Sequence, residues 1–231
     1  MDSQLPLPTN DQIEHAKHVP AELRELYQVY EVGHASAILS NDFPKLFSEL
    51  CVALGEFRFS KEQLLVGGGN ESLLTKSFQK LLDARGWREA QLVHRYEFDQ
   101  RIFKEGTRGS KQKSSKHIAD EKTEAYSSST HKIDFLKGRV AIDFEWNSKD
   151  QTFDRDLLAF RSFWELGRIS VGVLITRGAD MAGYLKDLGI SKKYGASTTH
   201  IDKLIPRLEA GRHGGCPILV FGITPRLENN D

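Results

Sequence analysis

The chain has 231 residues, of which 39% are hydrophobic and 28% are charged, and its formal net charge is zero. These values are typical of a globular protein and exclude a disordered or collagen-like chain. No apolar run approaches the roughly 18 residues of a membrane-spanning helix, so we expect no membrane association. The zero net charge gives no global support for nucleic-acid binding.

The cysteine content and the first residues indicate a cellular compartment. Two cysteines, Cys51 and Cys216, are too few for a disulfide framework and are typical of a reducing environment. The first residues, MDSQLPLPTND, lack the apolar core of a signal peptide. We therefore expect a cytoplasmic protein.

The N-terminal part is expected to be an arm followed by one large domain. Residues 1–27 begin polar and aperiodic and are predicted to form a partly ordered arm, with helical spacing of apolar residues over 21–30. A clear amphipathic helix is predicted over 44–54, since Gly55 is a suitable stop. The remaining chain, 28–231, is predicted to be a single domain.

Three glycines at 67–69 precede a predicted helix that runs from Asn70, a good N-cap, to about Arg85. Its apolar face continues back to Glu71, in the first turn. An acid at this position has two explanations. It complements the helix dipole, or it reaches a metal site as an additional acidic group.

A strand is predicted over 91–98, and a basic loop or insertion over about 104–130. The tip of this insertion carries five basic residues against one acid: Lys104, Arg108, Lys111, Lys113 and Lys116 against Glu105. The connection exceeds thirty residues, so it is expected to be partly helical, functional or mobile. Its basic residues fit a solvated polar loop and a DNA-contacting loop equally well.

The C-terminal half alternates helices and strands. Helices are predicted over 154–168 and 181–188, and a short helix capped by Ser197 or Thr198 and interrupted at Pro206 is predicted near the end. The runs 169–176 and 217–223 are continuously apolar, which is typical of strands covered on both faces. This order predicts an α/β fold with a mixed central sheet flanked by helices.

The stretch 131–146, HKIDFLKGRVAIDFEW, carries the most informative acids. On a strand, Asp143 and Glu145 point to one face while Ile142 and Phe144 point to the other. Carboxylates at the end of a buried strand are costly without a compensating positive charge. A hard divalent cation such as Mg²⁺ is the usual compensation, and Asp134, one hairpin earlier, is a candidate third ligand.

Such a site suits phosphodiester hydrolysis, because a divalent cation can position the attacking water and stabilise charge on phosphorus. Asp134 and Asp143 are the best ligand candidates, and Glu145 is either a ligand or the base that orients the water. The pattern D-x₈-D-x-E also fits solvated acids at a strand edge. Spacing alone therefore leaves both interpretations open.

Asp134 with Asp143-Phe144-Glu145 resembles the PD-(D/E)xK nuclease signature, with Glu145 in place of the lysine. Further stretches resemble type II restriction endonucleases of the BglII/BstYI/BamHI group: YEVGHASAIL (30–39), KLLDARGW (80–87), IDFLKGRVAIDFEW (133–146) and RLEAGRHGGCPILVFGITP (207–225). The resemblance implies a restriction-endonuclease-like core. It also implies a homodimer that binds double-stranded DNA and cuts both strands of a short palindrome with Mg²⁺.

By the same resemblance, Asp134 and Asp143 are expected to be metal ligands, and Glu145 is expected to fill the third position of the catalytic motif, where members of the group carry glutamate or glutamine instead of lysine. Glu71, or Thr75 one turn along, is the additional helix residue near the metal. Sequence-specific reading of DNA needs side chains that reach base edges. The candidates lie after the active-site strand and in the region 195–213: Asn147, Ser148, Lys149, Ser197, Thr198, Thr199, His200, Arg207 and Arg212.

Two alternatives remain. One is a non-specific, repair or modification-dependent DNA nuclease with the same core, and the other is a non-catalytic DNA-binding relative. The three acids argue against the second, because clustered negative charge disfavours binding to a polyanion. Walker and G-x-G-x-x-G patterns are missing from the sequence, so no nucleotide cofactor is expected.

Overall fold

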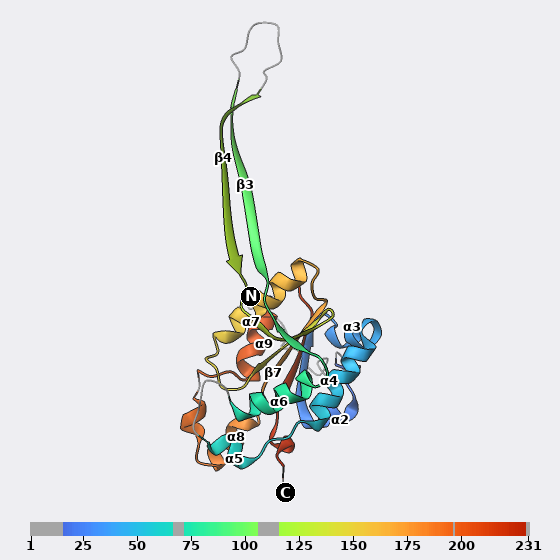
Figure 1. Ribbon diagram of the computed structural model, residues 1–231. Coiled ribbons are helices and arrows are strands. Elements are labelled where there is room, and N and C mark those ends of the chain that lie inside the picture. Colours follow the sequence, from blue (N-terminus) through green and yellow to red (C-terminus); the bar gives the residue numbers. More distant parts are fainter. Residues whose placement is uncertain (1–15, 67–71, 106–115, 196, 230–231) are drawn as a thin grey trace, which may run out of the picture. The chain divides into compact units, whose positions relative to one another are not determined.

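The computed structural model describes residues 16–66, 72–105, 116–195 and 197–229. The chain divides into two compact units (Figure 1). Residues 1–90 and 131–231 form the first unit, here called the body, and residues 91–130 form the second, here called the ribbon. No helix in the described part of the chain combines the length and apolarity needed to cross a bilayer.

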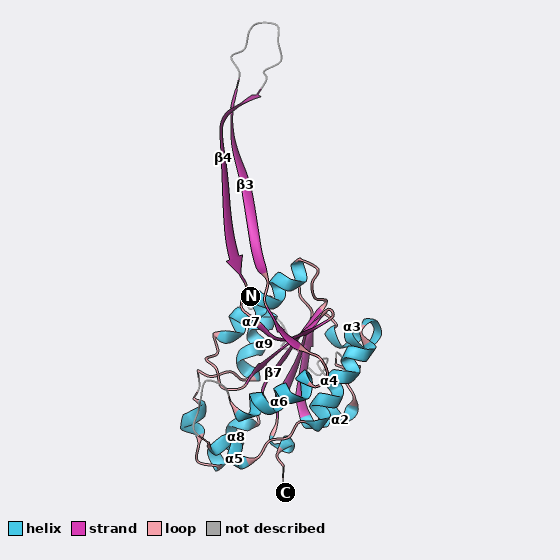
Figure 2. Cartoon of the chain, in the orientation of Figure 1, coloured by secondary structure: helices cyan, strands magenta, loops and turns pink. Residues whose placement is uncertain are grey.

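The described strands of the body form one mixed sheet (Figure 2). Its order across the sheet is β1 (Tyr27–Val32), β8 (Ile218–Ile223), β7 (Val171–Arg177), β6 (Val140–Glu145), β5 (Ile133–Lys137) and β2 (Arg88–Ala90). Strands β6, β7 and β8 run parallel, while β1, β5 and β2 join their neighbours antiparallel. The predicted mixed central sheet is confirmed.

Helices flank this sheet. In chain order they are α2 (Ala21–Leu26), α3 (Ala35–Asp42), α4 (Pro44–Glu56), α5 (Lys61–Leu65), α6 (Leu73–Asp83), α7 (Thr152–Glu165), α8 (Met181–Asp187), η1 (Ser191–Tyr194), α9 (Ile201–Glu209) and η2 (Pro225–Leu227). The predicted helices at 44–54, 154–168 and 181–188 correspond to α4, α7 and α8. The spacing of apolar residues was sufficient to predict these three helices, because each helix buries one apolar stripe of side chains.

The two faces of the sheet have different roles. On one face, Phe78 of α6 stacks on Phe144 of β6 with ring centroids 5.0 Å apart. On the other face, α7 packs so closely that Phe160 leaves no room for a side chain at Gly172 of β7. Strand alternation therefore sends Phe144 into the first layer and its neighbours Asp143 and Glu145 toward α7. The opposite orientation of Phe144 and the two acids is as predicted.

Near the N-terminus the structure corrects the predicted helix over 21–30. The helix ends at Leu26, and Tyr27–Val32 form strand β1, which pairs with β8. The Tyr27 hydroxyl donates to the Leu54 carbonyl at 2.9 Å. The helical spacing of apolar residues was misleading because pairing with the C-terminal strand determines the backbone here.

Two predicted helix caps are wrong. Helix α6 is capped by Ser72, whose hydroxyl accepts from the Thr75 amide at 3.0 Å, so Asn70 is not its cap. Helix α9 begins after His200 without a side-chain cap, and it continues through Pro206 to Glu209. Neither Ser197 nor Thr198 therefore caps it.

The ribbon consists of two long antiparallel strands, β3 (Val93–Glu105) and β4 (Lys116–Ser129). The predicted strand at 91–98 is confirmed and extends further. The insertion contains no helix in its described residues, so of the three alternatives given for it, partial helicity does not apply there. The basic tip residues at 106–115 lie outside the described residues.

The close approach of α7 to the sheet gives a stability prediction. A Cβ at Gly172 would lie 2.7 Å from Phe160 Cδ2 and 2.8 Å from Ile218 Cδ1. We expect Gly172→Ala to lower the free energy of unfolding by about 1–3 kcal/mol through overpacking. Urea denaturation measures this change.

The matched control is Gly183→Ala in helix α8, where a Cβ would meet nothing within 4 Å. This change should be neutral or stabilise by up to about 1 kcal/mol, because alanine favours a helix. Equal effects of the two substitutions would contradict the tight packing of α7 on β7.

Candidate active site

The β5–β6 hairpin fixes Asp134 beside Asp143. Phe135 pairs with Ile142, so the two aspartates occupy neighbouring positions on the same face. The Asp134 amide donates to Asp143 Oδ1 at 2.8 Å, and the Phe144 amide donates to Asp134 Oδ2 at 3.0 Å. These reciprocal bonds to rigid strand backbone hold both carboxylates in place.

Asp156 of α7 is a fourth acid at this site, and it was not predicted. It is 1% exposed, compared with 2% for Asp143 and 8% for Glu145. Its charge raises the pKa of Asp143, which indicates that the two carboxyl groups are close. The sequence held a signal, because Asp156 lies three residues after Phe153 and four before Phe160, on the buried stripe of α7.

Burial and mutual repulsion raise the pKa values of three of these acids. The pKa of Asp143 is raised by burial, then by the charges of Asp156 and Asp134. Burial also raises the pKa of Glu145, while a hydrogen bond from Ser148 opposes the rise. For Asp156, burial and the charge of Glu145 raise the pKa to about 8. The site therefore favours either protonated carboxyls or a bound cation.

Arg155 provides a positive charge at this cluster. Its Nη2 lies 3.6 Å from Glu145 Oε1 and 3.2 Å from Asp156 Oδ1. The side chain of Arg155 is 45% exposed, so it approaches the acids from the solvent side. Lys137, a nearby lysine along the chain, instead pairs with Glu49 at 2.5 Å.

The donor set suits a hard divalent cation. Asp143 Oδ2, Glu145 Oε2 and Asp156 Oδ2 are buried and have no hydrogen-bond partner in the structure. Carboxylate oxygens are the ligands that Mg²⁺ prefers. Among the described residues, however, no group of three or more His, Cys, Asp or Glu side chains is already arranged to hold a metal ion. The residues thus fit such a cation chemically, and its binding would require the carboxylates to converge.

Glu71 and Thr75 are the two candidates for the predicted helix residue near the metal. Glu71 lies outside the described residues. Thr75 lies in the first turn of α6, with its Oγ1 2.7 Å from Ser72 Oγ. The buried stripe of α6 packs on Phe144, on the face opposite Asp143. A contribution from Glu71 to the site therefore stays a prediction.

The segment after β6 pairs with the segment before α9, which brings two groups of predicted DNA-binding residues together. The Thr199 amide donates to the Ser148 carbonyl at 2.8 Å, and the Asp150 amide donates to the Ser197 carbonyl at 2.9 Å. Lys149 and Thr198 form the bridge between these bonds. Lys149 and Ser197 are exposed, whereas Thr199 is fully buried. Asn147 is half-buried and donates to the Lys193 carbonyl at 3.4 Å.

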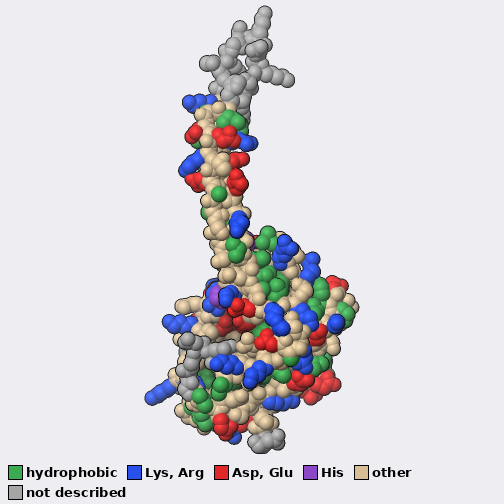
Figure 3. Space-filling view, viewed as in Figure 1, with side chains coloured by type: hydrophobic (Ala, Val, Ile, Leu, Met, Phe, Trp, Pro, Cys, Tyr) green, Lys and Arg blue, Asp and Glu red, His purple; other side chains and the backbone are tan. Residues whose placement is uncertain are grey.

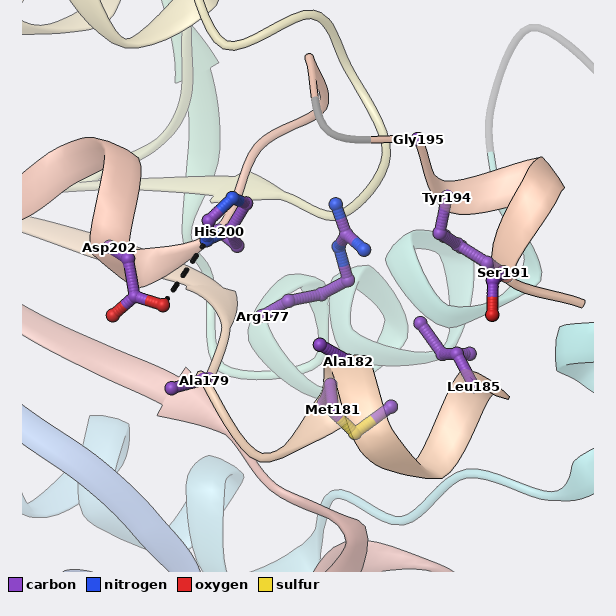
Figure 4. Close-up of a pocket in the computed structure, with 11 residues that line it drawn as sticks. Arg177, Ala179, Met181, Ala182, Leu185, Ser191, Tyr194, Gly195, His200 and Asp202 are labelled. Carbon is purple, nitrogen blue, oxygen red and sulfur yellow. Dashed lines mark ion pairs between the residues drawn. The ribbon is translucent and has the colours of Figure 1, made fainter. Parts of the chain in front are cut away.

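A cavity of about 180 Å³ is lined by the end of β7, by α8 and η1, and by the start of α9 (Figure 4). Arg177 extends into it between His200 and Tyr194, over an apolar floor that includes Met181 and Leu185. The guanidinium donates to the Thr199 carbonyl at 2.9 Å and also to Thr198 Oγ1. Burial lowers the pKa of Arg177 to about 10. Arg177 was not predicted, and it supports the loop that carries the DNA-binding candidates.

His200 lies at the edge of this cavity. Its Nδ1 is 3.7 Å from Asp202 Oδ2, the contact drawn as a dashed line in Figure 4, which is an ion pair only when the imidazole is protonated. Burial and the nearby charge of Arg177 lower the pKa of His200 below its ordinary value. This shift favours the neutral imidazole, which donates a hydrogen bond from one ring nitrogen and accepts one at the other.

Two predicted DNA-binding arginines contact acids of the body instead of lying free. Arg207 Nε is 3.2 Å from Asp154 Oδ2, and its Nη2 is 3.4 Å from Asp150 Oδ2. Arg212 also pairs with Asp154. These ion pairs join α9 and the turn after it to α7. In this arrangement both arginines have a structural partner, and their contact with DNA stays a prediction.

The raised pKa of Asp156 predicts a pH-dependent stability. The folded protein holds a proton on Asp156 up to about pH 8, whereas an unfolded aspartate releases it near pH 4. The contribution of Asp156 to stability is therefore full below about pH 4 and is lost as the pH rises to about 8. We expect Asp156→Asn to flatten this decline in EDTA, measured by urea denaturation at several pH values.

The exposed Asp187→Asn at the end of α8 is the matched control and should leave the decline unchanged. If Asp156→Asn follows the wild-type profile between pH 4 and pH 8, the buried proton is not on this carboxyl group.

Comparison with known proteins agrees with this geometry. The family profile described as restriction endonuclease BglII/BglIII matches residues 27–223, from the first residue of β1 to the last residue of β8. No curated protein matches the chain. The matched range includes the complete sheet and all four acids of the site. The chain therefore belongs to the BglII/BglIII restriction endonuclease family and is a type II site-specific deoxyribonuclease.

Proposed function

We propose that the protein is a homodimeric, Mg²⁺-dependent restriction endonuclease that hydrolyses one phosphodiester bond in each strand of a short palindromic DNA site. The observation that carries the metal dependence is the set of buried carboxylate oxygens without hydrogen-bond partners on Asp143, Glu145 and Asp156. Their negative charge would repel a phosphate unless a cation lay between them. Family membership supports double-stranded DNA as the substrate.

In this proposal Asp134, Asp143 and Glu145 hold the cation, with Asp156 as a further oxygen donor. When bound, the cation supplies Lewis acidity toward the phosphoryl oxygen and lowers the pKa of a bound water. Reciprocal backbone bonds orient Asp134 and Asp143. Glu145, at the end of β6, orients the attacking water by accepting a hydrogen bond from it.

Arg155 has a second role in the proposed mechanism. Its guanidinium contacts Glu145 and Asp156, yet almost half of the side chain remains exposed. A phosphate that approaches from solvent would therefore meet a cation before it meets the acids. Arginine suits this role because its planar donors match two phosphate oxygens. This positive group partly replaces the lysine of the PD-(D/E)xK pattern.

DNA contact is proposed for the paired segments 147–150 and 197–200. Backbone bonds hold them side by side directly after Glu145. Lys149 and Ser197 expose their side chains there, and the half-buried Thr198 and His200 lie beside them. Proximity to the catalytic acids would let a recognised sequence place its scissile phosphate at the metal.

Plasmid cleavage tests the catalytic proposal. Wild-type protein with Mg²⁺ should give discrete fragments, because the recognised site recurs at fixed positions. Asp143→Asn should lower the cleavage rate roughly 10³-fold or more, since it removes a charged ligand at the metal. Agarose gels quantified over time give the rates, with Asp187→Asn as the acid-removing control.

Other outcomes decide between the alternatives. A smear instead of bands would indicate a non-specific nuclease with the same core. A plasmid that is shifted on the gel but uncut by wild-type protein in Mg²⁺ or Mn²⁺ would show a DNA-binding protein without catalysis. Either result would refute the proposed site-specific cleavage.

Lys149 gives a separate prediction for DNA affinity. In the inactive Asp143→Asn background, Lys149→Ala should weaken DNA binding and reduce the salt slope of the binding constant by about one, because one phosphate contact is lost. Fluorescence anisotropy at several salt concentrations measures this slope. Lys186→Ala, an exposed lysine of α8, should leave the slope unchanged. A slope unaffected by Lys149→Ala would place the DNA elsewhere.

A further inference from the structure

The ribbon is amphipathic. Because directly opposed residues share a face, the pairing of Tyr96 with Tyr126 defines one aromatic face. The ring-bearing and apolar side chains of this aromatic face are His94, Tyr96, Phe98, Ile102 and Tyr126, and Gln100, Asp120, Lys122 and Glu124 share the face. The opposite face, here called the polar face, comprises Arg95, Glu97, Asp99, Arg101, Glu121 and Thr123, and past the bulge it continues into the exposed pair Phe103 and Ile118. An alternation of this kind is typical of strands with one buried side.

The aromatic side chains form a continuous stack. The ring centroids of Tyr96 and Tyr126 are 4.9 Å apart, and those of Phe98 and Tyr126 are 5.3 Å apart. His94 extends the stack, 5.7 Å from Tyr96. Even so, 40% of Tyr96, 46% of Phe98 and 53% of Tyr126 are exposed. The stacked rings cover part of one another's faces, while the outer surface of the stack stays open.

The charged and polar side chains of the polar face, by contrast, pair with one another on the ribbon itself. Arg101 Nε donates to Glu121 Oε1 at 2.6 Å, and Thr123 Oγ1 donates to Asp99 Oδ1 at 2.8 Å. A two-stranded ribbon without a covered face is only marginally stable in water. A contiguous exposed aromatic surface usually marks an interaction site. The aromatic face is therefore the candidate surface for a partner.

We infer that the partner is a second copy of this chain, which covers the aromatic face. The charges on that face are nearly balanced, since Lys122 pairs with Glu124 and Asp120 adds one acid. Figure 3 shows acidic and basic side chains interspersed along the ribbon. DNA-binding surfaces combine aromatic rings with a positively charged groove, which this face lacks.

Self-association also fits the balance of charge. A two-fold contact places the same patch on both partners, so a patch of one sign would repel itself. Here the centre of the contact would be aromatic, and the flanking charges include both signs. Aromatic residues are the side chains that carry most of the binding energy in protein interfaces.

The area of the aromatic face predicts that two copies associate weakly and reversibly. Strand β3 has 13 residues, so at ~3.4 Å per residue and ~10 Å of width its face covers roughly 400 Å² per copy. Two copies would bury roughly 800 Å², below the ~1,200 Å² of a standard stable interface. We therefore expect a dissociation constant in the micromolar range from this surface.

The inference deepens the homodimer of the proposed function and is tested without metal or DNA. Sedimentation velocity of the full chain in EDTA measures association. The triple variant Tyr96→Thr, Phe98→Thr and Tyr126→Thr removes the aromatic stack while keeping residues that favour strands. It should weaken dimerisation at least about tenfold. The matched polar-face variant, Arg95→Thr, Glu97→Thr and Ala125→Thr, should dimerise as the wild type does.

Cross-linking gives an independent measurement if the triple variant alters the ribbon. Phe98→Cys lies in the middle of the aromatic face, and Asp99→Cys lies next to it on the polar face. A short bis-maleimide should link two copies of the first variant and not of the second. Both variants keep Cys51 and Cys216, so the native thiols contribute equally.

Three results would overturn the inference. The first is a wild-type chain that stays monomeric at about 100 µM, well above the expected dissociation constant. The second is a triple variant that dimerises as tightly as the wild type, with no cross-link at Phe98→Cys. The third is an unchanged dimer with lost DNA affinity, which would assign the aromatic face to DNA. Plasmid cleavage by the triple variant is scored separately, so failure of the nuclease proposal remains distinguishable.

Discussion

The burial of three carboxyl groups between β6 and α7 is the constraint on which the proposed active site depends. Parallel strands such as β6 must be covered on both faces, and α7 provides one cover. Its buried stripe carries Asp156 toward the face where strand alternation has already placed Asp143 and Glu145. The acids thus share a space with little water, where each raises the pKa of its neighbours.

The same packing gives the site its rigidity. Backbone amides of the β5–β6 hairpin hold Asp134 and Asp143, so neither carboxylate depends on a mobile loop. On the far side of α7, the ion pairs of Arg207 with Asp150 and Asp154 join helix α9 to the same frame. The segment that carries the DNA-binding candidates is therefore fixed to the helix that carries Asp156. Recognition and cleavage would share one structural support.

The alternation of side chains along a strand has different results in the body and in the ribbon. In β6 the alternation of side chains sends Phe144 into an aromatic layer and Asp143 toward a helix, so both faces are covered. In β3 the same alternation separates Tyr96 and Phe98 from Arg95 and Glu97, but the aromatic side remains 40–46% exposed. The first pattern completes a core, and the second leaves a surface for association.

Sequence periodicity by itself determined the elements whose burial is local. The helix α4, the apolar strand β7 and the opposite orientation of Asp143 and Phe144 all follow from spacings of 3.6 or two residues. The acids Asp134, Asp143 and Glu145 were predicted to form the site because a charged pair that ends an apolar strand needs compensation, and their clustering is what the structure adds.

Only the tertiary structure determined the features that depend on distant residues. Tyr27–Val32 became a strand because it pairs with β8, nearly two hundred residues later, and no local spacing encodes that partner. Asp156 joined the site because α7 packs on β6, although its position on an apolar stripe could have indicated this. Arg177 gained its role from a loop that folds back over it. The sequence encodes which side chains are buried, whereas contacts across the fold decide which of them meet.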